Sequence, residues 1–274
     1  MKTFHLHLVS DATGESVSSV ARACLVQFEG IEPTEHFWSM IRTDRQLERL
    51  LVGIKANPGP VMFTLVNPEF RTALTELCRQ LQVPCVSVLD PAMAALGRHL
   101  ELESRNLPGR QHVLDAEYFG RIEAIDFALN HDDGQSTQDL IEADVVVVGV
   151  SRTSKTPTCM YLANRGLKAA NVPVVPGCPL PLELLSIPAV EDGGPLIVGL
   201  TKDPARLIQI RRNRVRMLNQ EQETDYTDPE TVKAELAAAR RLFTEHDWPV
   251  IDVTRRSIEE TAAAIMNLHG GWQD

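Results

Sequence analysis

Residues 143–148, which end in four consecutive valines, constrain the fold of this chain more than any other segment. β-Branched side chains favour extended backbone, and an uninterrupted apolar run is typical of a strand buried on both faces. Such strands belong to parallel sheets that helices cover on both sides. Apolar runs at 172–175, 196–200 and 250–253 are of the same type. We therefore predict an α/β domain with a mostly parallel sheet in residues 141–274.

The N-terminal part of the chain alternates between strand and helix patterns. Strands are predicted at 4–10, 35–40, 61–66 and 84–89, and helices at 17–28, 43–55 and 68–81. Right-handed crossovers dominate between parallel strands, so residues 1–105 are expected to form a doubly wound, mostly parallel sheet. Functional loops are expected at the carboxyl ends of its strands.

The segment 106–140 is predicted to connect the two α/β domains. It begins with a turn-rich stretch, Asn106-Leu-Pro-Gly109, and continues with a helical pattern at 116–129. It ends with Asn130-His-Asp-Asp-Gly134, whose residues favour turns and helix termination. A chain of 274 residues has room for two such domains.

The charge balance argues against several kinds of partner. With 27 Lys and Arg against 37 Asp and Glu, the net charge is -10, which opposes binding to nucleic acid or to anionic membranes. The sequence shows neither an apolar stretch long enough to span a bilayer nor a signal-peptide pattern at its start. Its five cysteines lack CxxC spacing, which favours reduced thiols and a cytoplasmic location.

A loop whose residue spacing matches a known motif follows the predicted strand at 143–148, called the valine strand below. Residues 149–156, Gly-Val-Ser-Arg-Thr-Ser-Lys-Thr, match the phosphate-loop motif GxxxxGK[ST], except that Ser154 replaces its second glycine. Such a loop combines inward N–H groups, a helix N-terminus, a lysine for the outer phosphates and a hydroxyl for Mg²⁺. The alternative is a polar turn before a capped helix. The predicted nucleotide-binding residues are Gly149, Val150, Ser151, Arg152, Thr153, Ser154, Lys155 and Thr156, with Thr156 also on the metal.

Four residues are candidates for the catalysis of phosphoryl transfer. Lys155 can neutralise phosphate charge, and Arg152 offers a forked donor unless it only faces solvent. Asp132 and Asp133 precede the valine strand, and a carboxylate usually orients or deprotonates the attacking hydroxyl. The two carboxylates could instead share a Mg²⁺ or form part of an Asx turn that ends a helix.

A second phosphate site is predicted in the first domain. Asp11, Thr13, Gly14 and Ser16 follow the first strand and precede a helix, and they offer small donors to an anion. The residues alone favour a different interpretation, in which Ser10 or Asp11 caps that helix.

Three weaker features complete the set of candidates. A helix after residue 203 carries arginines that act either as a lid over the transferred phosphate or as a basic face for an acidic partner. Asp252 is either a carboxylate near the metal or the cap of the next helix. His5 and His7 favour a packed pair over a metal site. The arginines are Arg206, Arg211, Arg212, Arg214 and Arg216.

Motifs along nearly the whole chain resemble one family of regulatory enzymes. They are Ser10-Asp-Ala-Thr-Gly-Glu-Ser16, Asp126-Phe-Ala, His131-Asp-Asp-Gly134, the loop 149–157 with Tyr161-Leu-Ala163, Ala170-Asn-Val-Pro173 and Ile197-Val-Gly-Leu200. With them the chain is similar to the bifunctional serine/threonine kinase and pyrophosphorylase proteins that regulate pyruvate, phosphate dikinase or phosphoenolpyruvate synthase. Ser154 is part of this family's pattern.

The resemblance implies two opposing reactions. In one, ADP donates its β-phosphoryl group to a threonine of the dikinase or synthase and inactivates that enzyme. In the other, inorganic phosphate attacks the phosphothreonine, releases pyrophosphate and restores the enzyme.

Two further functions stay open on the residues alone, a phosphate-loop kinase of a small metabolite and an ADP-sensing protein without catalysis. A homodimer is the default assembly for a chain of this kind.

Overall fold

The protein consists of two compact α/β units, Met1–Val113 and Leu114–Asp274. The structure, a computed structural model, describes residues 1–103, 116–217 and 226–270. Each unit contains a four-stranded sheet in which every neighbouring pair of strands is parallel. The predicted fold class is confirmed.

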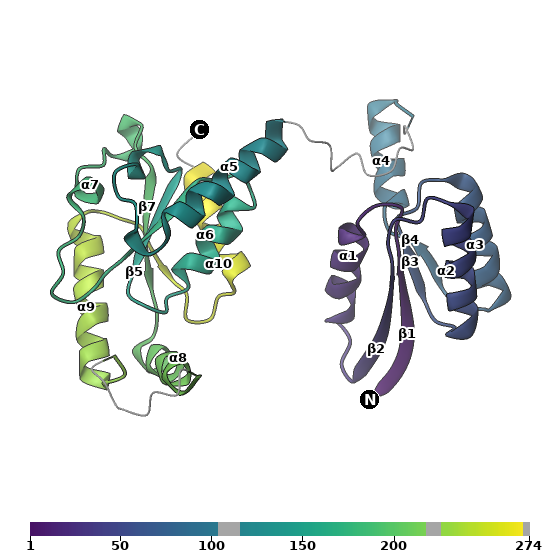
Figure 1. The fold of residues 1–274 in the computed structure, drawn as a ribbon, viewed down its shortest axis with the longest axis horizontal. Helices are drawn as coiled ribbons and strands as arrows, with labels where there is room; N and C mark the ends of the chain where they lie inside the picture. Colours follow the sequence, from purple (N-terminus) through teal and green to yellow (C-terminus); the bar gives the residue numbers. More distant parts are fainter. Residues whose placement is uncertain (104–115, 218–225, 271–274) are drawn as a thin grey trace. The chain divides into compact units, whose positions relative to one another are not determined.

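The first unit is a parallel sheet with helices on both faces, with the strand order β2-β1-β3-β4. Val17 of α1 shares a core cluster with Leu8, whereas Leu50 of α2 and Leu74 of α3 share another with Val9. Successive residues of β1 point to opposite faces, so α1 covers one face and α2 and α3 cover the other (Figure 1). The elements are β1 (Lys2–Val9), α1 (Glu15–Leu25), β2 (Ile31–Trp38), α2 (Asp44–Ala56), β3 (Val61–Phe63), α3 (Pro68–Gln80), β4 (Cys85–Ser87) and α4 (Asp90–Leu100).

Two helices of the first unit begin at side-chain caps that the sequence supplies. Thr43 accepts from the backbone N–H of Gln46, and the Gln46 side chain accepts from the backbone N–H of Thr43. Asn67 accepts from the N–H of Glu69 at 2.8 Å, and Pro68 follows it as the first helical residue. These contacts satisfy N–H groups that the first turn of a helix leaves free.

The second unit surrounds the valine strand, with the strand order β6-β5-β7-β8. Val146 and Val148 of β5 lie in one core cluster with Phe243, and Val145 and Val147 lie in another cluster. The strand is thus buried on both faces, as its composition predicts. The strands and helices are α5 (Ala116–Asn130), β5 (Val145–Gly149), α6 (Lys155–Ala163), β6 (Ala169–Pro173), α7 (Leu182–Leu185), β7 (Leu196–Thr201), α8 (Pro204–Met217), α9 (Pro229–Glu245), β8 (Val250–Asp252) and α10 (Ile258–Gly270).

Helix α5 lies within the second unit and packs there. Ala124 and Ala128 of this helix form a small buried cluster with Ala163 at the end of α6. A short 3-10 helix, Asp132–Gly134, follows α5. The segment 106–140, expected to connect the domains, therefore contains a helix of the second unit; its first residues, up to 115, lie outside the described part of the chain.

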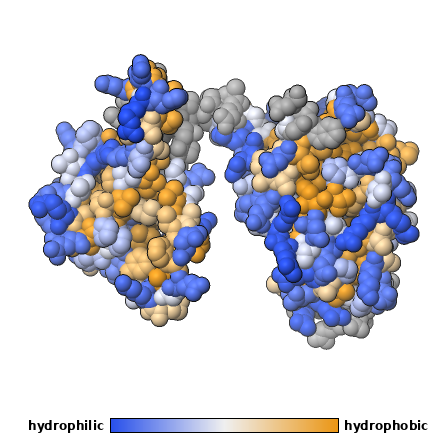
Figure 2. Space-filling model, turned by 180° about the vertical axis from the view of Figure 1, so that it is seen from behind, coloured by the Kyte–Doolittle hydropathy of each residue, from blue (hydrophilic) through white to orange (hydrophobic). Residues whose placement is uncertain are grey.

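On the face that Figure 2 shows, apolar residues gather over the middle of each unit, and hydrophilic residues surround them. Exposed large apolar residues include Phe28 and Phe37 in the first unit and Phe119 and Leu182 in the second. No helix within the described ranges is both long enough and apolar enough to cross a bilayer.

Candidate functional site

The loop from β5 to α6 has the backbone conformation of an anion-binding site. Arg152 and Ser154 have φ values of 74° and 68°, and left-handed residues among right-handed ones turn successive N–H groups toward one concavity. Residues 151 and 152 form a hydrogen-bonded turn after Val150, and within the described part of the chain the backbone N–H groups of Ser151, Arg152 and Ser154 meet no hydrogen-bond acceptor. The helix N-terminus of α6 follows directly and adds its own free N–H groups.

Glycine is required at position 149 because two neighbours approach its backbone closely. A Cβ atom there would lie 2.9 Å from the carbonyl oxygen of Leu200 and 2.8 Å from Oγ1 of Thr153. The Thr153 hydroxyl in turn donates to the carbonyl of Val150 at 2.9 Å. Gly149 therefore lets strand β7 and the loop close around the end of β5.

Ser154 adopts the backbone conformation that the second glycine of the motif usually supplies. Its φ of 68° and ψ of 28° lie in the left-handed region, and its side chain makes no capping hydrogen bond. A residue with a Cβ atom pays about 1–2 kcal/mol for this conformation. The substitution therefore retains the turn of the loop at a cost in local strain.

Lys155 is buried within the loop that precedes it. Its side chain is 5% exposed, and Nζ lies 3.5 Å from the Val150 carbonyl and 4.0 Å from Oδ1 of Asp133. Burial lowers the pKa of the Lys155 ammonium, and the charge of Asp133 opposes this shift. The concavity formed by the N–H groups of this loop is called the anion nest below, and Lys155 lies at its opening. A partly desolvated ammonium there interacts strongly with a phosphate.

Asp132 and Thr156 meet at the start of α6. The Thr156 hydroxyl donates to Oδ1 of Asp132 at 2.8 Å, and the side-chain amide of Asn171 donates to the same oxygen. The Asn171 side chain also accepts from the backbone N–H of Asp133 at 3.1 Å. Asn171 of β6 thus fixes both aspartates beside the loop, and the Asp132 carboxylate faces α6 rather than forming an Asx turn.

Tyr226 contacts two side chains of the loop. Its hydroxyl lies 3.2 Å from Oγ of Ser151 and accepts from Nε of Arg152 at 3.2 Å. Arg152, although exposed, is therefore held beside the loop rather than free in solvent. Neither Tyr226 nor Asn171 belongs to a local motif around residues 149–156, and only the fold brings them there.

Comparison with known proteins places this site in a family. A model of kinase/pyrophosphorylase proteins matches residues 6–266. A protein of Paramagnetospirillum magneticum is 60% identical over 98% of this chain and 85% of its own length. Relatives from Caulobacter vibrioides and Rhizorhabdus wittichii are 54% and 55% identical over 98% of this chain, and over 84% and 96% of their own lengths. All three are named pyruvate, phosphate dikinase regulatory protein.

The chain belongs to the kinase/pyrophosphorylase family. The family that the sequence motifs predict is thereby confirmed, and with it an enzyme that is a kinase and a phosphorylase. Asp132, Asp133 and the loop 149–156 all lie in the part of the chain that the family model covers.

The N-terminal candidates of this kinase/pyrophosphorylase are arranged differently from a helix cap. The Asp11 carboxylate accepts from the N–H of Val66 at 2.7 Å, and Ser10 accepts from the N–H of Ala12 at 3.1 Å. Gly14, with a φ of 83°, is the N-cap of α1, and no side chain caps it. The interpretation that Ser10 or Asp11 caps α1 is therefore wrong.

A phosphate site at Asp11, Thr13, Gly14 and Ser16 stays a prediction. Burial raises the pKa of Asp11, and its hydrogen bond from Val66 opposes that shift. A bound anion beside this carboxyl would favour its protonated form further.

The arginines of α8 divide into two groups in this family member. Arg211 is 1% exposed and donates to Oε2 of Glu235 at 2.7 Å. It therefore cannot serve on a lid. The arginines that face solvent are Arg206, Arg212, Arg214 and Arg216.

Lys202 is a site residue that the sequence did not single out. It directly follows β7, is 5% exposed, and donates to the Arg152 carbonyl at 3.3 Å. Burial lowers its pKa, and Arg206 adds to this effect.

Asp252, at the end of β8, accepts from the N–H of Thr254 at 2.8 Å, whereas Ser257 caps the helix that follows. The interpretation of Asp252 as that cap is wrong.

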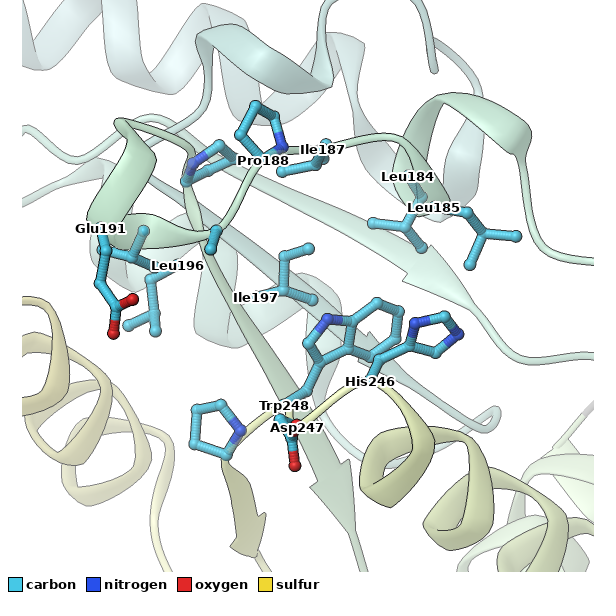
Figure 3. A pocket seen from close by; sticks show the side chains of 14 residues that line it. Leu184, Leu185, Ile187, Pro188, Glu191, Leu196, Ile197, His246, Asp247 and Trp248 are labelled. Carbon is cyan, nitrogen blue, oxygen red and sulfur yellow. The ribbon is translucent and has the colours of Figure 1, made fainter.

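Two pockets open on the second unit. One of about 280 Å³ adjoins the loop at Val150 and is lined by residues 174–180 and by Glu235 of α9. A larger one of about 450 Å³ lies at the other end of the sheet, between residues 184–191, the start of β7 and Trp248 (Figure 3). Of these two, the smaller pocket borders the loop, at Val150.

The donors beside the loop suit one metal ion in particular. Among residues 1–103, 116–217 and 226–270, no three His, Cys, Asp or Glu side chains cluster as a complete metal site. Thr156 and Asp132 supply a hydroxyl and a carboxylate, and Mg²⁺ takes few protein ligands and completes its shell with water and phosphate oxygens. The residues present therefore fit Mg²⁺ bound together with a phosphate ligand.

Proposed function

We propose that this chain is a regulatory protein of pyruvate, phosphate dikinase that transfers the β-phosphoryl group of ADP to a threonine of that enzyme. We also propose that it removes the group again with inorganic phosphate. One observation carries the proposal, the anion nest of the loop with buried Lys155 at its mouth, in a chain of the kinase/pyrophosphorylase family.

The loop 149–156 would bind the diphosphate of ADP. Its free N–H groups face the anion, and Lys155 and Arg152 neutralise the charge that builds up during transfer. The threonine oxygen attacks the β-phosphorus, the bond to the bridging oxygen breaks, and AMP leaves. In the opposite reaction a phosphate oxygen attacks the phosphothreonine, the bond to the threonine oxygen breaks, and pyrophosphate leaves.

Thr156 of α6 and two aspartates of the 3-10 helix Asp132–Gly134 would complete the site. Thr156 and Asp132 would hold Mg²⁺, which when bound neutralises charge on the phosphate oxygens. Asp133, whose side chain is 62% exposed near Lys155, would orient the incoming threonine hydroxyl and take its proton.

The proposed location is the cytoplasm, because all five cysteines are free thiols and such thiols are typical of a reducing compartment.

The proposal is tested by incubating the protein with β-labelled ADP, Mg²⁺ and purified dikinase, and separately with phosphoenolpyruvate synthase. Label on a threonine of the dikinase, with AMP as product, is the expected result. Transfer from ATP to a small metabolite would point to a metabolite kinase, and ADP binding without transfer to either target would point to a sensor. Either outcome contradicts the proposal.

A further inference from the structure

All buried lysine and arginine side chains of the described residues contact the phosphate loop. Lys155, Lys202 and Arg211 are 6%, 5% and 1% exposed. They donate to the carbonyl oxygens of three successive loop residues: Lys155 to Val150 at 3.5 Å, Arg211 to Ser151 at 3.3 Å, and Lys202 to Arg152 at 3.3 Å. Burying a charge costs free energy of folding. Three buried cations on this one loop therefore lower the stability of the fold, which indicates that their contacts serve the loop.

Two of these cations reach the loop from other elements. Gly149 pairs with Leu200 in the parallel register of β5 and β7, which places Lys202 beside the loop two residues later. Arg211 lies on α8 and is fixed by Glu235 of α9 at 2.7 Å and by the Tyr226 carbonyl at 3.1 Å.

The contacts determine where the loop N–H groups point. A trans peptide directs its C=O and its N–H to opposite sides, and the described residues contain no cis peptide. With the Ser151 carbonyl toward Arg211, the N–H of Arg152 points away from Arg211. With the Arg152 carbonyl toward Lys202, the N–H of Thr153 points away from Lys202.

We propose that Lys202 and Arg211 are positioning residues of the phosphate loop. They hold the Ser151 and Arg152 carbonyls, and this keeps the N–H of Arg152 turned toward the anion and Arg152 in its left-handed conformation. Lys202 also has a second effect. Glu235 pairs with Arg211 and Asp133 lies 4.0 Å from Lys155, whereas no carboxylate in the described ranges forms an ion pair with Lys202. The charge of Asp252 acts on Lys202 without an ion pair, and the negative charge of a bound diphosphate adds to it.

This inference rests on the proposed phosphate-binding role of the loop, and it is tested on the full chain without a target enzyme. Inorganic pyrophosphate with Mg²⁺ is titrated calorimetrically into wild type, Lys202→Met, Lys202→Arg and Lys233→Met. Lys233 is an exposed lysine of α9 that pairs with Glu230, so its variant is the matched control. Loss of a charged hydrogen bond to the loop predicts about 10- to 100-fold weaker binding for Lys202→Met. Lys202→Arg, which keeps a cationic donor, recovers part of that loss, and Lys233→Met binds like wild type.

Thermal unfolding of each variant separates positioning from folding. Weaker binding at an unchanged unfolding midpoint supports the proposal; wild-type affinity in Lys202→Met overturns it. Arg211 is tested through Glu235→Gln, which removes its ionic partner and leaves the arginine in place. Wild-type affinity in this variant overturns the role of Arg211.

Should Lys202→Met not fold, Lys202→Gln replaces it; weaker pyrophosphate binding is again expected, and wild-type affinity overturns the proposal. Absence of pyrophosphate binding in the wild type would instead refute the loop assignment under the proposed function.

Discussion

Lys155 is the residue on which the proposed transfer depends most directly. Lys155→Ala removes the ammonium at the mouth of the nest, and we expect at least about a 100-fold loss of phosphoryl transfer, as for other donors to developing charge. The fold should persist, because the removed group is a desolvated ammonium rather than an apolar core side chain. Label transfer and thermal unfolding measure the two effects. Lys233→Ala is the control, and a folded Lys155→Ala protein with full activity would refute the assignment.

Thr156 belongs to the proposed magnesium site through its hydroxyl. Thr156→Val keeps the shape of the side chain but removes the oxygen that contacts Asp132. We expect transfer by this variant to require a higher Mg²⁺ concentration, measured as the Mg²⁺ dependence of the transfer rate. Thr72→Val on α3 removes a helical threonine hydroxyl in the other unit and serves as control. An unchanged Mg²⁺ requirement in Thr156→Val would assign the hydroxyl a structural role only.

His7 predicts a dependence of stability on pH. Its Nε2 donates to the Asn57 carbonyl at 2.8 Å, and its Nδ1 accepts from the Trp38 indole at 3.1 Å, so the Trp38 indole favours the neutral ring. Burial lowers the pKa of His7, the Asn57 carbonyl opposes this, and His36 and His5 lower the pKa further. Between the lowered folded pKa and the unfolded value of about 6.5, the unfolded chain binds more protons. The free energy of unfolding should therefore fall as pH falls below about 6.5.

Urea unfolding at a series of pH values measures this effect. His7→Gln keeps a donor and an acceptor but does not titrate, so the variant should lose part of the pH dependence. His99→Gln, at an exposed position of α4, should retain it. An identical pH profile for His7→Gln and wild type would assign the dependence to other groups.

At the scale of elements, the end of β5 tolerates no side chain. The Cβ of Gly149→Ala would press on the Leu200 carbonyl of β7, and we expect a destabilisation of about 1–3 kcal/mol, as for overpacked cores. Gly120→Ala on α5 is the matched control, because its Cβ meets nothing within 4 Å and alanine is the better helix former. Denaturant unfolding compares the two. Equal free energies of unfolding for Gly149→Ala and wild type would show that the loop moves to make room for the added methyl group.

The sequence predicts β5 and β7 to within two residues, whereas β6, which is also buried, is predicted at 172–175 and spans Ala169–Pro173. β5 was predicted because both of its faces are apolar. β2 was predicted at 35–40 but spans Ile31–Trp38. It lies at the edge of the sheet, where polar residues and Pro33 are tolerated, so its sequence carries little of the strand pattern.

Only those residues of the candidate site that lie close together in the sequence could be predicted. The spacing of Gly149, Lys155 and Thr156 identifies the loop by itself. Asn171, although part of the family motif 170–173, could not be assigned to the loop from the sequence, and neither could Lys202 and Tyr226. The parallel register and the packing of separate elements bring them there. Arg211 was assigned to the wrong environment, since a helix rich in arginine suggests an exposed face and only the packing of α8 against α9 buries it.

At the scale of the molecule, each unit has its own sheet and its own core clusters. Every contact described for the loop comes from the second unit. We therefore expect residues 114–274, produced alone, to fold and to bind pyrophosphate with an affinity within about threefold of the full chain. Calorimetry on the fragment and the full chain measures this. A folded fragment that does not bind would mean that the first unit contributes to the loop.

The buried pair of Arg211 and Glu235 has a consequence for how this protein diverges over evolution. Losing either partner leaves the other charge buried and alone, at a cost of about 3–5 kcal/mol, which is a large share of the stability of a domain. A single substitution at either position is therefore expected to be removed by selection. Among relatives, positions 211 and 235 should change together or not at all, even though twenty-three residues separate them in the sequence.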